Sequence, residues 1–130
     1  MANPVIVQEW LEKADEDFRF AEAGLNGGSE FYAQLCFHFQ QAAEKYLKAF
    51  IIARDLALEK VHDLVHLLKT CSTFDPAFAA LKEDCITLNA AYIETRYPVH
   101  WPTSYTKDTA DQSHTAALNI ARMVRHQLGA

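Results

Sequence analysis

The residues best suited to chemistry lie close together near the start of the last quarter of the chain. Arg96 and His100 are separated only by Tyr97, Pro98 and Val99. A guanidinium binds a phosphate through two parallel hydrogen bonds, and an imidazole transfers protons near neutral pH. The two groups together could cleave RNA without a metal ion, with the imidazole acting at the 2′-hydroxyl or at the leaving oxygen. An arginine in the last turn of a helix can equally stabilise that helix by binding its terminal carbonyls.

A second pattern with chemical meaning is formed by His62 and His66, which are four residues apart. On a helix this spacing puts two imidazoles one turn apart, as zinc sites require, and Cys71 lies a little further on. A catalytic zinc site of this kind also needs a glutamate at the second position and a third ligand. The second position here is Asp63, which is equally suited to cap a helix that begins at Leu64. We therefore expect a structural role for the histidine pair and no metal or other cofactor. A metal protein that uses His62 and His66 stays open as an alternative, which metal analysis of the purified protein would settle.

A third candidate is a polar line along a segment that is otherwise apolar. Spacings of three and four residues put its members on one side of a helix. Its lysines are candidates for binding a nucleotide, RNA or a protein partner, and a solvated helix face is the alternative interpretation. The line consists of Gln34, His38, Gln41, Lys45 and Lys48.

Composition and charge limit the classes of protein to which the chain can belong. It has 130 residues, of which 50% are hydrophobic, so we expect one domain over residues 1–130 with a substantial core. The formal net charge of -5 excludes a broad, non-specific nucleic-acid binder, so any contact with nucleic acid must come from a local basic patch. Cys36, Cys71 and Cys85 form no CxxC pair, which favours a reducing cytoplasm. The longest aliphatic cluster, residues 50–53, is far shorter than the roughly 20 residues of a membrane span, so we expect no membrane contact.

The elements that must position these residues are helices, because apolar residues recur at helical spacing and no alternating stretch appears. The first helix is predicted over about residues 5–23, with Asp15 among its solvent-facing residues. Ser29 is a candidate N-cap for a second helix that continues to about Arg54. A short helix near residues 62–71, a fourth helix from Pro76 to Arg96, and a last helix from 107 or 108 to 127 complete the set.

The second predicted helix is apolar on most of its circumference. Such a helix is typically central, packed on several sides by neighbours or by a second subunit. Short connections favour antiparallel neighbours, so the predicted fold is all-α: an up-and-down antiparallel bundle of four long helices plus one short helix. The apolar stripes of this second helix are Leu35, Phe39, Ala42, Tyr46, Ala49 and Ala53 on one side and Phe37, Leu47 and Ile51 on another. Cys36 and Cys85 also fall on apolar faces, where we expect buried, inert thiols.

Four stretches of the chain resemble the HEPN family, the higher eukaryotes and prokaryotes nucleotide-binding domains. The resemblance implies a bundle of four or five helices that forms a homodimer. It also implies a partner, a minimal nucleotidyltransferase, with which the protein forms a toxin–antitoxin module. The matching stretches are WLEKADED at 10–17, FQQAAEKYLKA at 39–49, HDL at 62–64 with Leu67 and Leu68, and Arg96-Tyr97-Pro98 followed by Tyr105-Thr106.

The resemblance also implies a site. Active members of the family are metal-independent endoribonucleases whose motif is an arginine, four to six residues, then a histidine. The matching candidates here are Arg96 and His100 as catalytic residues. For RNA or nucleotide bound at the dimer cleft, the candidates are Arg96, Tyr97, Lys45 and Lys48.

One departure from the family motif leaves an alternative open. Three residues separate Arg96 from His100, one fewer than the family's minimum. Many relatives with an Arg-Tyr-Pro segment resemble non-catalytic binding partners. The alternative is therefore a nucleotide-binding or protein-interaction module that accompanies a nucleotidyltransferase. The sequence also leaves open whether Tyr97 or Tyr105 is modified by a partner.

Overall fold

The computed structural model describes residues 2–94 and 105–130, and every regular element within them is helical. The predicted all-α class is thereby confirmed. None of the described helices combines the length and the apolar character that crossing a membrane requires. In chain order the elements are α1 (Pro4–Asn26), α2 (Tyr32–Ala53), α3 (Leu64–Phe74), the 3₁₀ helix η1 (Pro76–Leu81), α4 (Lys82–Asn89), α5 (Ala91–Glu94) and α6 (Lys107–Leu128).

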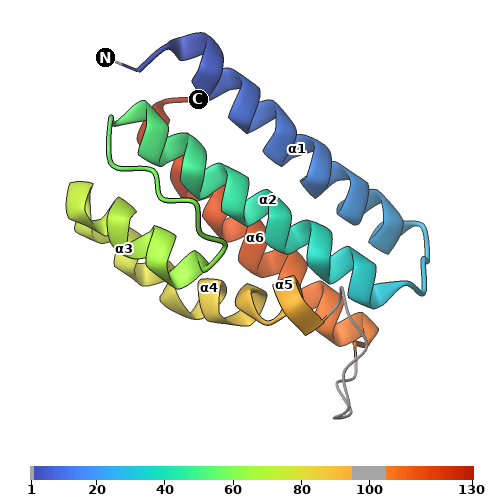
Figure 1. Ribbon diagram of the computed structural model, residues 1–130. Helices are drawn as coiled ribbons and strands as arrows, with labels where there is room; N and C mark the ends of the chain where they lie inside the picture. Colours follow the sequence, from blue (N-terminus) through green and yellow to red (C-terminus); the bar gives the residue numbers. More distant parts are fainter. Residues whose placement is uncertain (1, 95–104) are drawn as a thin grey trace.

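Helix α2 is the centre of the bundle. It contacts each of the other described α-helices, and Figure 1 shows α1 along one side of it, with α3 and α4 on the other. Most of both predicted apolar stripes is buried, as the central position requires. The other helices of the same chain thus cover the apolar circumference of α2. The apolar character of α2 therefore gives no separate argument for a second subunit. The buried members of the stripes are Leu35, Phe39, Ala42, Tyr46, Leu47, Ala49 and Ile51.

The link between α2 and α3, residues 54–63, turns back and runs beside α2 (Figure 1). As a result α3 starts near the middle of α2 and runs in the same direction. The side-chain amide of Gln40 lies 3.4 Å from the carbonyl oxygen of His62, just before α3. Ten residues further along α2, the ring of Phe50 packs at 5.6 Å between centroids from that of Phe74, at the end of α3. These two helices are therefore an exception to the antiparallel order expected from short connections.

The segment predicted as a fourth long helix is divided into η1, α4 and α5. Pro76 does occupy the first turn, and the Asp75 side chain caps it by accepting a hydrogen bond of 2.9 Å from the backbone N–H of Ala77. Apolar spacing in this segment predicts a buried stripe of five residues. Phe78, Leu81, Cys85 and Leu88 are buried as predicted, whereas the fifth, Tyr92, is only half-buried. Over six residues the apolar pattern does not distinguish the three-residue turn of η1 from the 3.6-residue turn of an α-helix.

The helix ends show which predicted caps are correct. The predicted N-cap at Ser29 is wrong, because α2 begins at Tyr32 after Phe31 and has no side-chain cap. The Ser29 hydroxyl instead accepts a hydrogen bond of 3.2 Å from the backbone N–H of Phe31, in the turn before the helix. Helix α6 agrees with prediction to within one residue and ends at Gly129, whose φ of 70° is the left-handed conformation that glycine favours.

Candidate functional site

The structure describes part of the predicted site. Arg96, Tyr97 and His100 lie outside the described residues. Lys45 and Lys48 are both on α2. We therefore build the site from the polar residues of α2 and from the segments that contact them.

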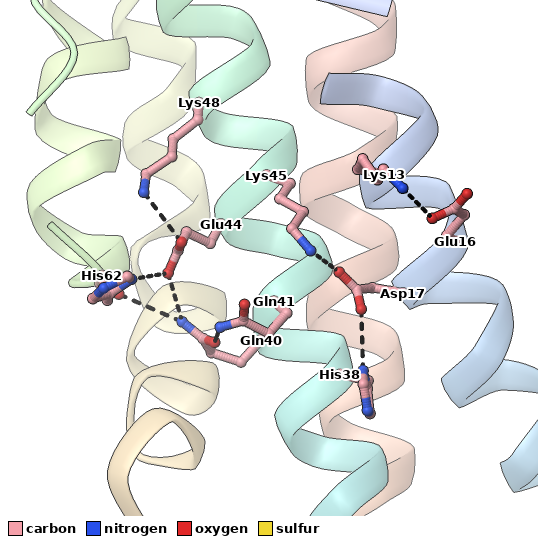
Figure 2. Close-up of polar contacts among 10 residues, drawn as sticks. All are labelled: Lys13, Glu16, Asp17, His38, Gln40, Gln41, Glu44, Lys45, Lys48 and His62. Carbon is pink, nitrogen blue, oxygen red and sulfur yellow. Dashed lines mark hydrogen bonds and ion pairs between the residues drawn. The ribbon is translucent and has the colours of Figure 1, made fainter. Parts of the chain in front are cut away.

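A buried carboxylate lies at the junction of α2 with the link that precedes α3. Glu44 is only 7% exposed at its side chain. Its Oε1 atom lies 3.0 Å from Nδ1 of His62 and accepts a hydrogen bond of 3.4 Å from Gln40, while its Oε2 atom accepts one of 3.1 Å from the ammonium of Lys48. Figure 2 shows these four residues, which we call the Glu44 cluster, with their contacts converging on Glu44. Burial of a charge is costly unless it is paired and hydrogen-bonded in this way.

Three of the four residues come from a single line on α2. Gln40, Glu44 and Lys48 follow one another at intervals of four residues, so they share one side of the helix. The fourth, His62, is brought to the line by the returning link. Its ring also stacks on Tyr92 of α5, with centroids 4.4 Å apart and an angle of 17° between the planes. The cluster therefore joins α2, the link and α5.

The start of α3 is fixed beside this cluster by two residues. The Asp63 carboxylate caps α3 and accepts hydrogen bonds from the backbone N–H of Val65 at 2.9 Å and from the amide of Asn89, on α4, at 2.8 Å. The Asn89 side-chain oxygen accepts in turn from the backbone N–H of Leu64 at 2.8 Å. The hydrogen bond from Asn89 holds the pKa of Asp63 below its usual value. The predicted cap at Asp63 is confirmed.

The two histidines of the HxxxH pattern do not share a helix face, contrary to the expected spacing on a helix. Helix α3 begins at Leu64, so His62 precedes it. His62 pairs with Glu44, whereas Nε2 of His66 lies 2.7 Å from the carboxylate of Glu59. Within residues 2–94 and 105–130, no three histidine, cysteine or acidic side chains gather as metal ligands would.

The polar line predicted along α2 is not a solvated face, because only Gln34 among its five residues is exposed. Asp17 of α1 lies 3.0 Å from Nδ1 of His38 and accepts a hydrogen bond from Lys45 (Figure 2). Burial by itself would raise the pKa of Asp17, but the hydrogen bonds from His38 and Lys45 outweigh it and lower that pKa. Lys45 and Lys48 therefore each bind a carboxylate of the same chain.

A third polar contact joins α1, α2 and α6. The hydroxyl of Tyr46 donates to Asp15, and the guanidinium of Arg125 donates to the other oxygen of Asp15 at 2.6 Å. The expectation that Asp15 faces solvent is wrong, since its side chain is 21% exposed and paired on both oxygens. Burial, reinforced by the hydrogen bond to Asp15, raises the pKa of Tyr46 and keeps the hydroxyl protonated.

The cysteines are buried thiols, as predicted for Cys36 and Cys85. Burial raises the pKa of Cys71 and of Cys85 to about 12, and it also raises the pKa of Cys36. A thiol with such a pKa holds its proton at neutral pH and is a poor nucleophile. We therefore place no chemistry on the cysteines.

Sequence reasoning missed Glu44, Gln40 and Tyr92 as members of the site. One signal was present: three polar residues at intervals of four on a mostly apolar helix indicate a buried polar contact. No local pattern indicates that His62, eighteen residues further on, completes it. In chemical terms the cluster holds one half-exposed imidazole in a fixed orientation through a buried carboxylate, an arrangement suited to proton transfer.

The fold and the Glu44 cluster define a small helical protein with a central α2 and a buried carboxylate beside α5. Similar solved structures include the following three. The protein TT1696 from Thermus thermophilus is 32% identical, with a TM-score of 0.77 over 92% of this chain and 96% of that chain. ST0689, an archaeal HEPN homologue, is 28% identical, with a TM-score of 0.75 over 93% and 96%. A HEPN domain protein from Thermotoga maritima is 23% identical, with a TM-score of 0.75 over 93% and 98%, and shows the fold alone.

The sequence pattern of the HEPN domain matches residues 7–127. The chain therefore belongs to the HEPN domain family. No curated protein matches the sequence significantly.

The lowered pKa of Asp17 predicts a pH-dependent contribution to stability. A carboxyl whose pKa is lower in the folded chain than in the unfolded chain stabilises the fold above the unfolded value, 3.8, and loses this contribution as the pH falls through the folded value. We expect Asp17→Asn to cost at least about 1 kcal/mol at neutral pH, because hydrogen bonds to charged groups are lost. The difference from wild type should vanish in acid, where Asp17 itself is protonated. Urea unfolding of the wild type and of Asp17→Asn over a pH series measures this difference in the free energy of unfolding.

A matched control is Glu16→Gln, which removes a carboxylate one residue away in the exposed pair with Lys13, where both side chains are 68% exposed. This change should alter the free energy of unfolding by no more than about 0.5 kcal/mol at any pH. A cost of Asp17→Asn that stays constant from neutral to acid pH would show that the charge of Asp17 contributes nothing.

Proposed function

We propose that this HEPN protein binds RNA and cleaves it without a metal ion, with Arg96 holding the scissile phosphate and His100 protonating the leaving 5′-oxygen. The observation that carries the proposal is the Glu44 cluster, which lies beside α5. Buried charges contribute little to stability and are frequent at functional sites. Arg96 follows the end of α5 by two residues in the sequence. Family membership supports the same assignment through the resemblance of the Arg96 segment to the family motif.

The chemistry of the proposed reaction needs few parts. In RNA the 2′-hydroxyl attacks the adjacent phosphorus, the 5′-oxygen leaves, and a 2′,3′-cyclic phosphate remains. A guanidinium neutralises the charge that develops on the phosphate, and an imidazolium supplies the proton that the leaving oxygen needs. Phosphate binding belongs to Arg96 with Tyr97 in this proposal. Lys45 and Lys48 would first have to leave the carboxylates of Asp17 and Glu44.

The proposal includes partners. Two copies of the chain would form a homodimer, so that two arginines supply a local positive site on a protein whose net charge is -5. The pair would act in the cytoplasm with a minimal nucleotidyltransferase as a toxin–antitoxin module. A nucleotidyltransferase gene beside this one, and co-purification of the two products, would support this part of the proposal.

The nuclease proposal predicts that purified protein cleaves single-stranded RNA in the presence of EDTA and leaves cyclic phosphate ends. Arg96→Ala should lower the cleavage rate at least about 100-fold, as loss of one group that stabilises the transition state does. The control is Arg122→Ala, which removes an exposed arginine of α6 and should leave the rate unchanged.

Intact RNA after long incubation with an excess of wild-type protein would contradict cleavage. Retention of that RNA, or of a nucleotide, on the protein would then favour the non-catalytic binding module. Equal cleavage by Arg96→Ala would indicate that the phosphate is held elsewhere.

The dimer proposal predicts the mass in solution. Light scattering at micromolar concentration should give twice the 14.7 kDa of one chain. A mass of 14.7 kDa under these conditions would remove the two-copy site, and cleavage would then have to come from one chain.

A further inference from the structure

The imidazole of His62 is held on two sides and open to solvent. Its Nδ1 atom lies 3.0 Å from Glu44, and its ring stacks on Tyr92 at 4.4 Å between centroids. The His62 side chain is nevertheless 49% exposed, while its carboxylate partner is 7% exposed. A buried carboxylate thus holds one nitrogen of a ring that is half-exposed as a whole; Figure 2 shows the contact between His62 and Glu44.

The contacts of Glu44 determine which ring nitrogen carries the hydrogen. Glu44 also binds the ammonium of Lys48 at 3.1 Å, so its carboxylate is ionised and can only accept hydrogen bonds. Nδ1 of His62 must therefore donate. In the neutral ring this leaves the lone pair on Nε2, and no described residue donates to that atom. A lone pair on an accessible, oriented imidazole is what a general base requires.

His66, four residues later and inside α3, has a different arrangement. It is 43% exposed, close to the value for His62, and it also pairs with a glutamate. Its contact, however, uses Nε2, at 2.7 Å from Glu59, whose side chain is 56% exposed. The contact with Glu59 lacks hydrogen-bond geometry, and Nε2 of His66 is itself buried, so the atom that would act as a base is closed to a ligand. His66 is therefore a matched comparison for His62.

We propose that His62, oriented by Glu44, is the general base of the RNA-cleaving site. This inference rests on the proposed function. Nε2 of His62 takes the proton from the 2′-hydroxyl as the 2′-oxygen bonds to phosphorus. The bond from phosphorus to the 5′-oxygen breaks, the oxygen keeps the electron pair, and it takes the proton that the proposed function assigns to His100. Exchange with water returns both rings to their starting protonation, so no other reactant is consumed.

The charged and titratable groups around His62 come from three elements. Glu44 and Lys48 face it from α2, Tyr92 faces it from α5, and Asp63 follows it in the chain with its carboxylate fixed on Asn89. A His62 ring that already carries both protons cannot take another from the 2′-hydroxyl, so cleavage should fall on the acid side of the pH profile.

The test compares His62 and His66 variants in RNA cleavage in EDTA. His62→Asn retains an amide donor for Glu44 and removes the base, so it should fold normally and lower kcat/KM at least about 100-fold, the usual contribution of a general base. The acid limb of its pH profile should be lost. Added imidazole should restore cleavage to His62→Ala, because a half-exposed site can admit the free base. His66→Asn and His66→Ala should keep wild-type rates and profile.

The outcomes separate this inference from the function on which it rests. Cleavage that depends on Arg96 but is unchanged in rate and pH profile by His62→Asn would overturn the role of His62 and leave the nuclease intact. The role of His62 would also be overturned by two results together. In these, imidazole does not restore activity to His62→Ala, and the pH profile of His62→Asn keeps the wild-type shape. No cleavage by the wild-type protein would overturn both.

Discussion

The ionised carboxylate of Glu44, buried within a helical bundle, is the constraint on which the arrangement of the other elements depends. Leaving such a charge unpaired would cost several kcal/mol. Its partners on α2, Gln40 and Lys48, supply two contacts, and the third must come from outside that helix. The link that follows α2 therefore returns along it and delivers His62. Where this link ends, α3 begins, and the α4 residue Asn89 fixes that start.

Helix α2 carries polar contacts toward α1 and α6 as well. Asp17 lies between His38 and Lys45, and Asp15 between Tyr46 and Arg125. Apolar burial alone is non-directional and would tolerate some sliding of one helix along another. A carboxylate held by donors from neighbouring helices does not tolerate such sliding, because a shift by one turn would leave the carboxylate buried without partners. The ion pairs thus set the register, while the apolar stripes supply most of the stabilisation.

Much of the fold could be predicted from the sequence, because helical periodicity and chain breakers are local signals. The position of α6, the cap at Asp63 and the burial of the α2 stripes follow from such signals. The errors concern partners that are distant in the sequence. The local pattern predicts a solvent-facing Asp15, yet its partner Arg125 is 110 residues away. Likewise the spacing of His62 and His66 predicts a shared helix face, but the contact with Glu44 holds His62 in the link before α3.

The role of His62 as a base depends most directly on the position of its ring hydrogen, which the contact with Glu44 fixes on Nδ1. Nitrogen-detected NMR of the histidine rings, at a pH where they are neutral, measures this position. We expect a hydrogen on Nδ1 and a bare Nε2 for His62. A His62 ring that carries its hydrogen on Nε2 would contradict the account, because that nitrogen could then accept no proton from RNA.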